Sequence, residues 1–345
     1  MKSFANLAIQ VGCSLFAVDA TQLDCRSNET HIVWKTAPTT MATMPTFGRR
    51  RSQTTIRQTN CVVQPRKQAE QECLKYLQDT IMPFDVPFFE TLGFGNHKDD
   101  EVDGLGNGIV TVSVRLALDA KATYEWTDSL PKDIFYNYVV NYANLNEART
   151  NWRPLLIDAM NFTESVLWKS GNANLSSVVT WVNTHLWTQL SRHGDDKPIY
   201  FKSGQTPLIF DPMSVIAYGY ASCTGTSILF SNALRALGIP SRVAGTPAWY
   251  GNATQGNHNW VEVYDRGVWK FLEPSPALAD VDTLDADPCG RWFCNKERYP
   301  SSQVYAATLS KVVSSYFPLA WESNCKDIPA LDRTQYYADV CGICD

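Results

Sequence analysis

Residues 218–227 read YGYASCTGTS and lead directly into an apolar run that continues to Leu237 and stops at Gly238. Pro240 follows, and a glycine stop with a proline beyond it is typical of a helix C-terminus. The pattern therefore predicts a helix whose N-terminus lies close to Cys223. A cysteine there feels the positive end of the helix dipole and unpaired backbone N–H groups, which lower its pKa and favour a nucleophilic thiolate. The alternative interpretation is a buried, unreactive cysteine.

A strand is predicted downstream, where residues 256–264 read GNHNWVEVY. Alternation along this stretch places His258, Trp260, Glu262 and Tyr264 on one face. The imidazole of His258 is therefore predicted to lie on a strand rather than on a loop.

The returning strand of a hairpin ends at Glu273. A turn centred on Arg266 places Glu273 opposite residue 259, within about one position of His258. A bulge at Gly267 could decide which faces meet. We therefore expect a carboxylate close to the imidazole.

A thiol, an imidazole and a carboxylate divide the work of acyl transfer among three residue types. Cys223 would attack an acyl carbon, His258 would take its proton and later protonate the leaving amine, and Glu273 would orient the imidazole. Glu262 is a rival for the third role, although a supporting role on the histidine strand suits it better.

The N-terminus resembles a cleavable secretion signal, with Lys2, a mostly apolar stretch at 4–16 and small residues at Val18 and Ala20. A buried N-terminal helix is the alternative. No later run approaches the length of a membrane span. We expect a secreted protein without a membrane span, carrying four glycosylation triplets that begin at Asn28, Asn161, Asn174 and Asn252.

Cysteine usage supports an oxidising compartment. Of ten cysteines, Cys13 lies in the predicted signal, so an odd number remains and one thiol is unpaired. Cys223 is the best candidate for that thiol. A redox role for the C-terminal Cys-x-x-Cys is possible, but structural cystines suit its position better. The remaining cysteines could form four disulfides, with pairing left open: Cys25, Cys61, Cys73, Cys289, Cys294, Cys325, Cys341 and Cys344.

Composition excludes other classes of function. The 30 basic and 35 acidic residues give a net charge of -5, which provides no bulk attraction for nucleic acid or an anionic membrane. Residues 99–104 superficially resemble a calcium loop, but Val110 stands at the twelfth position, where such a loop requires Glu. We predict no metal and no cofactor.

Three groups of residues, in this order and spacing, resemble the transglutaminase-like superfamily. They are 219–223, then 233–245 (ALRALGIPSRVAG), then 256–263 with Trp269 and Glu273-Pro274. Most of that superfamily has Asp where this chain has Glu273, which offers the same carboxylate on one more methylene. A narrower resemblance, to secreted members with Ser-Cys-Thr-Gly before the helix, covers about 110–300.

The resemblance implies an α+β, papain-like fold in which the cysteine helix packs on an antiparallel sheet bearing the histidine and the glutamate. It also implies an oxyanion contact from the Cys223 backbone N–H and an upstream side chain, for which Gln205 is a candidate, though an ordinary surface glutamine is an equal alternative. We expect a signal at 1–20, a cysteine-containing, partly disordered leader at 21–80, a helical part at 81–205, a catalytic core at 206–300 and a cysteine-containing extension at 301–345.

The predicted activity is thiol-dependent acyl transfer on a peptide, protein or glycopeptide. Without a visible calcium loop, amide hydrolysis of the protease, amidase or N-glycanase type is favoured over protein crosslinking. A catalytically silent module that binds carbohydrate or protein is the third possibility, and eleven tryptophans keep it open. An intact Cys223 and His258 argue against it. The oligomeric state is left undetermined.

Overall fold

The computed structural model describes residues 56–94, 108–190, 197–276, 281–310, 313, 315–322 and 324–344. The chain divides into two compact units, Met1–Pro65 and Arg66–Asp345. Of the first unit only the start of helix α1 is described, and the sheet and the candidate site both belong to the second unit. The predicted signal at 1–20, the first glycosylation triplet and the acidic stretch at 99–104 lie outside the described residues.

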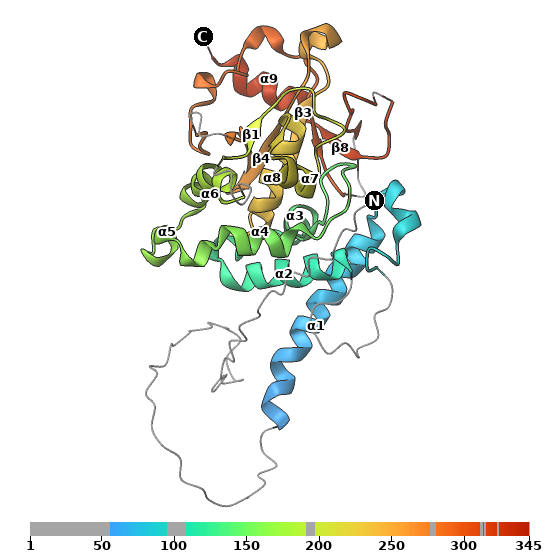
Figure 1. The fold of residues 1–345 in the computed structure, drawn as a ribbon, viewed down its shortest axis with the longest axis vertical. Helices are drawn as coiled ribbons and strands as arrows, with labels where there is room; N and C mark the ends of the chain where they lie inside the picture. The colour runs from blue at the N-terminus through green and yellow to red at the C-terminus, as the bar shows by residue number, and fades with distance from the viewer. Residues whose placement is uncertain are drawn as a thin grey trace, which may run out of the picture. The chain divides into compact units, whose positions relative to one another are not determined.

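The first half of this second unit is mostly helical, as the apolar spacing predicts. Helix α3 continues as a π-helical turn over Tyr136–Val140. Helices α2 and α4 run side by side, and both contact α8 (Figure 1). In order, the helices are α1 (Ile56–Asp79), α2 (Ile109–Thr123), α3 (Lys132–Phe135), α4 (Trp152–Met160), α5 (Val166–Lys169), α6 (Leu175–Gln189), α7 (Pro212–Tyr218), α8 (Cys223–Ala236) and α9 (Thr334–Gly342).

Helix α8 is the central helix of the unit, and its predicted start at Cys223 and stop before Gly238 are confirmed. Every residue from Thr224 to Ala236 is buried, because α4 and α6 cover one side of α8 and the main sheet covers another. A helix buried all round is held rigidly, so the cysteine at its N-terminus has a fixed position.

Within the described residues the main sheet is antiparallel, with the order β5-β4-β3-β6-β8-β7, and a separate parallel pair joins β1 to β2. Val261 and Val263 of β4 face the α8 core, whereas Trp260 packs on the other side with Tyr337 of α9. The strands are β1 (Tyr200–Phe201), β2 (Tyr220–Ala221), β3 (Ser241–Thr246), β4 (His258–Asp265), β5 (Val268–Leu272), β6 (Tyr305–Ala307), β7 (Ser315–Tyr316) and β8 (Pro329–Asp332).

The hairpin register differs from the prediction by one residue. Val261 pairs with Leu272, so Glu273 follows in line with Trp260 rather than with residue 259. The reason is the turn: Arg266 and Gly267 both have positive φ, of 49° and 89°, as the two central residues of a tight hairpin do. The turn is thus centred between these residues and needs no bulge.

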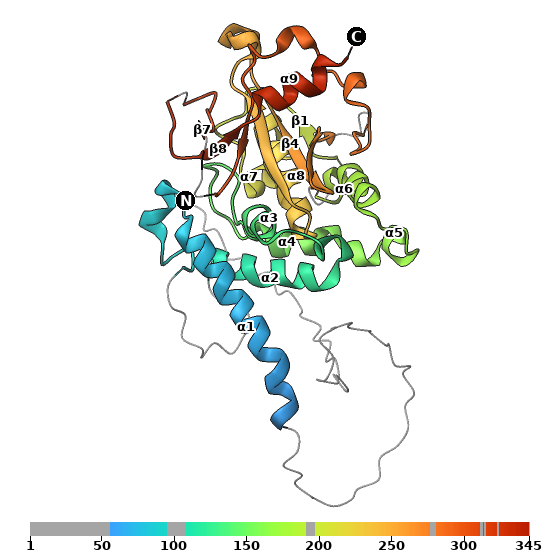
Figure 2. The same cartoon turned by 180° about the vertical axis from the view of Figure 1, so that it is seen from behind.

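The chain after residue 300 is part of the same fold. Strands β6, β7 and β8 extend the sheet beyond β3. Helix α9 lies at the opposite end of the sheet from α2 and α4 in both views (Figures 1 and 2). The proposed boundary at 300 stays a prediction, but the sheet runs across it. Among the described residues no helix has the length and apolar character to cross a membrane.

Candidate active site

Cys223 is the first residue of α8 and is half-buried. Gly219, with φ 74°, ends α7 and turns the chain into the short strand β2, which leads directly to the cysteine. The neighbouring Ser222 hydroxyl contacts the hydroxyl of Thr206, so the preceding loop lies beside this helix start. The loop that contains Thr206 is therefore attached to the start of α8, directly before Cys223.

His258 is the first residue of β4 and pairs with Thr246 at the end of β3. Next to this pair, Gly245 lies opposite Asn259, and a Cβ at position 245 would come within 2.6 Å of the His258 carbonyl oxygen. Only glycine allows the two strands to approach so closely at this point. The Asn259 side chain accepts a hydrogen bond from Thr224 Oγ1 at 2.8 Å, which ties the histidine strand to the cysteine helix.

Glu273 accepts a hydrogen bond from the imidazole of His258. Its carboxylate oxygens lie 3.0 and 3.2 Å from His258 Nε2, which donates its proton to them. The side chains of His258 and Glu273 are 18% and 27% exposed, so the pair is partly shielded from water. With Nε2 engaged, Nδ1 is the ring nitrogen left to face the thiol.

The electrostatics of the pair favour a thiolate and an imidazolium. Burial opposes ionisation of Cys223, but the hydrogen bond and charge of His258, with the backbone N–H of Asn259, outweigh it and lower the thiol pKa. Burial likewise opposes the charged imidazole, yet the Glu273 carboxylate and the Cys223 sulfur raise the pKa of His258 to about 10. Each partner stabilises the other's charge.

Glu262 does not contact His258 in this arrangement. It is fully buried, lies 2.6 Å from Arg242 Nη2 and 3.0 Å from Arg333 Nε, and accepts a hydrogen bond from Tyr337 at 3.0 Å. Both carboxylate oxygens are therefore committed to Arg242, Arg333 and Tyr337, and the supporting role predicted for Glu262 stays a prediction. Trp260 is also buried and donates its indole N–H to the Tyr337 hydroxyl at 2.7 Å.

Gln205 donates its side-chain amide to the backbone carbonyl of Ser203 at 2.9 Å. Its neighbour Thr206 contacts Ser222, so the Gln205 loop is adjacent to the helix start, while the amide itself is engaged within that loop. An oxyanion role for Gln205 stays a prediction.

Sequence reasoning missed three residues around the pair. The Trp292 ring meets the His258 ring edge to face, with centroids 5.0 Å apart. Asp282 accepts a hydrogen bond from the backbone N–H of Glu273 at 2.9 Å and is ion-paired to Arg291. The two cysteines that flank Trp292, Cys289 and Cys294, were the only local sign that this loop is held in place. No local pattern predicts that the loop packs against His258.

Two disulfides lie within the described residues, Cys289–Cys344 and Cys294–Cys341. The two cysteines of the C-terminal Cys-x-x-Cys thus belong to separate cystines, which confirms the structural interpretation. Cys223 is free, as predicted, but Cys73 and Cys325 are free as well. The expectation that these two are oxidised is wrong; each is buried in an apolar cluster, where a thiol packs as a small hydrophobe.

Comparison with known proteins agrees with this geometry. Residues 168–274 match the family model described as the Transglutaminase-like superfamily. The match includes Cys223, His258 and Glu273 and ends before the disulfide loop. Together with the interactions of His258 with Cys223 and Glu273, the match supports a thiol enzyme in general terms. The narrower group of secreted members stays a prediction.

Among solved structures, the chain is similar to "a Putative Cysteine Protease from Cytophaga hutchinsonii" at 16% sequence identity and a TM-score of 0.28. The similar region covers 59% of this chain and 64% of that chain. The search of curated proteins gave no match.

Proposed function

We propose that this protein is a cysteine-dependent enzyme that transfers acyl groups at amide bonds, with hydrolysis of a peptide, protein or glycopeptide as the favoured reaction. The observation that supports the proposal is the line of contacts from Cys223 to His258 to Glu273, with a lowered thiol pKa and a raised imidazole pKa. This is the charge state that a thiol nucleophile needs.

In the first half-reaction the Cys223 thiolate attacks the amide carbonyl carbon and forms a tetrahedral oxyanion. The oxyanion collapses to a thioester as the C–N bond breaks, and the proton held by His258 passes to the departing amine. The carboxylate of Glu273 keeps the ring in place and stabilises its positive charge before that transfer. The Cys223 backbone N–H, at the start of α8, is the proposed oxyanion donor.

In the second half-reaction the neutral His258 accepts a proton from the incoming nucleophile as that nucleophile attacks the thioester. Water yields an acid and regenerates the thiol, whereas an amine yields a new amide. The chemistry at Cys223 is the same in both cases, so the acceptor depends on which molecule reaches the thioester.

Mass spectrometry of products tests the proposal. The full chain is incubated with a peptide, a glycopeptide and a glutamine peptide plus an amine, beside Cys223→Ala and the untreated substrates. Hydrolysis predicts a gain of water and a transient acyl adduct on the peptide that contains Cys223. Amine incorporation would support a crosslinking enzyme instead. A chain that binds these substrates while Cys223 never becomes acylated would return the protein to the binding-module hypothesis.

We also propose secretion. Two disulfides are compatible with an oxidising compartment, and Asn161, Asn174 and Asn252 are exposed. Expression with the native N-terminus in a eukaryotic cell should deliver a product to the medium that begins near residue 21 and loses mass on deglycosylation. Retention in the cytosol with an intact N-terminus would contradict this.

A further inference from the structure

The loop between Cys289 and Cys294 places the aromatic ring of Trp292 against His258. Trp292 is half exposed, at 49%, and its ring lies 5.0 Å from the His258 ring centroid at an interplanar angle of 73°. It also meets Trp249 edge to face at 5.8 Å. The guanidinium of Arg298 lies over both indoles, 4.8 Å from Trp249 and 5.7 Å from Trp292.

Both ends of this loop are fixed to the last turn of α9 and the residues directly after it. Cys289 is joined to Cys344 and Cys294 to Cys341, so two cystines bracket Trp292 and tie it to the end of α9. Helix α9 in turn is held to the histidine strand, because the Tyr337 hydroxyl contacts both Trp260 and Glu262. A covalent and hydrogen-bonded frame therefore runs from Trp292 through α9 back to β4.

The same loop reaches the carboxylate side of the pair. Arg291, next to Trp292, is ion-paired with Asp282, and Asp282 accepts the backbone N–H of Glu273 at 2.9 Å. The loop between Cys289 and Cys294 thus contacts the His258 ring directly through Trp292. It contacts the backbone of Glu273 indirectly, through Asp282.

We infer that Trp292 is a positioning residue for the thiol chemistry and that the two disulfides hold it against His258, so that full nucleophilicity of Cys223 depends on their oxidation. This inference rests on the proposed function. An aromatic ring whose face meets a cation within about 6 Å stabilises that cation, and its bulk excludes water from the cation's surface. Trp292 therefore favours the imidazolium, and through it the Cys223 thiolate.

Alkylation of Cys223 by iodoacetamide, followed by peptide mapping across pH, measures the thiolate fraction without a substrate. The variants are Trp292→Ala and Trp292→Phe. Tyr316→Ala is the matched control, since Tyr316 is also a half-exposed aromatic, at 42%, but lies on β7 at the far edge of the sheet from β5.

In Trp292→Ala the alkylation rate near pH 6 should fall about threefold to tenfold, the size of a lost aromatic contact. Above pH 9 it should approach the wild-type rate, because the thiol then ionises unaided. Trp292→Phe should lie between the two, and Tyr316→Ala should match the wild type. If Trp292→Ala only changed the access of iodoacetamide to Cys223, the alkylation rate would change by the same factor at every pH. That result would overturn the inference.

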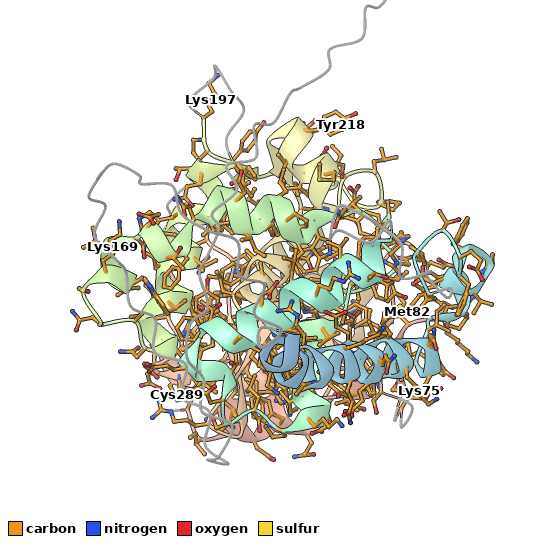
Figure 3. The ribbon with its side chains drawn as sticks, turned by 90° about the horizontal axis from the view of Figure 1, so that it is seen from below. Lys75, Met82, Lys169, Lys197, Tyr218 and Cys289 are labelled. Carbon is orange, nitrogen blue, oxygen red and sulfur yellow. A yellow bond between two sulfur atoms is a disulfide. The ribbon has the colours of Figure 1, made fainter. Side chains whose placement is uncertain are left out.

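The disulfide arm uses paired replacements, Cys289→Ser with Cys344→Ser and Cys294→Ser with Cys341→Ser, so that no new thiol is created. Each double variant should show the same fall in the Cys223 alkylation rate near pH 6 as Trp292→Ala. Cys289 is exposed and lies at the periphery in Figure 3, so mild reduction of the wild type should act there first. Unchanged acid-side alkylation in both pairs and in Trp292→Ala would overturn the inference. An ordinary thiol pKa for Cys223 in the wild type would instead overturn the proposed function.

Discussion

Glu273 Oε1 lies 3.0 Å from Nε2 of His258, so Nδ1 is the ring nitrogen that remains for the hydrogen bond between His258 and Cys223. The arrangement follows from the hairpin register. Leu272 pairs with Val261, so Glu273 comes next to Trp260, on the same face of the sheet as His258. One residue of slip in either strand would turn the carboxylate to the α8 side.

Replacement of the triad residues should separate bond making from orientation. We expect Cys223→Ala to abolish turnover, whereas Glu273→Gln should lower kcat on the order of 10³-fold and leave measurable activity, because the carboxylate orients His258 without forming bonds. Thermal unfolding should change little in either variant, since both side chains are partly exposed. Initial rates and unfolding curves on the same samples check this. Wild-type turnover by Cys223→Ala would contradict it.

The rate constant should follow a bell-shaped pH profile. The acid limb reports formation of the Cys223 thiolate, and because His258 lowers that pKa, the limb should lie below pH 9, the ordinary value for the thiol. The alkaline limb reports loss of the His258 proton, whose pKa is raised to about 10. Both limbs belong to the coupled pair. A profile that keeps its shape in His258→Ala, or that depends on added zinc, would contradict the assignment.

The thiols should differ sharply in reactivity. Non-reducing peptide mapping should find the two cystines of the C-terminal region and free thiols at Cys73, Cys223 and Cys325. Of these three thiols, mildly acidic iodoacetamide should label Cys223 alone, because burial raises the pKa of Cys73 to about 12 and Cys325 is only 8% exposed. Recovery of Cys223 in a disulfide as the main form would exclude it as the nucleophile.

Glu262→Gln should affect folding rather than chemistry. Burial opposes its charge, but Arg242 and Arg333 outweigh burial and lower the pKa of Glu262 below its ordinary value of 4.5. Its ionised form therefore contributes stability above about pH 4.5, and this contribution is lost as the pH falls through the lowered pKa.

At neutral pH, removal of that charge leaves two arginines without their partner and should cost about 3–5 kcal/mol of unfolding free energy. Denaturant titrations at pH 7 and at progressively lower pH check this, with Glu273→Gln as the matched carboxylate control. A large loss of kcat in Glu262→Gln with unchanged stability would show that the wrong carboxylate was assigned to His258.

Local patterns were sufficient to predict the elements that carry the site. The apolar run ending at Gly238 determined helix α8, and the alternation after residue 256 determined β4. Both signals lie within the elements themselves. The register error arose because Arg266 adopts a positive φ, which is uncommon for a residue other than glycine and is not indicated by its side chain.

The contacts around the pair depend on residues distant in sequence. Trp292 reaches His258 only because cystines to Cys341 and Cys344 fix its loop, and cysteine pairing does not follow from spacing. The burial of Cys73 and Cys325 is equally non-local, since their apolar neighbours come from several elements. Counting cysteines thus gave the right free thiol at Cys223 but the wrong number of bridges.

The position of β3 has a consequence for how the chain is made. Its neighbours are β4, which follows at once, and β6, which belongs to a group of strands completed only at Asp332. Until that residue has emerged from the ribosome, one edge of a half-finished sheet has open N–H and C=O groups, which recruit strands from other molecules. A nascent or truncated chain that stops near residue 300 is therefore the aggregation-prone form of this protein, and its yield in a cell should depend on chaperones that cover this edge during the last stage of synthesis.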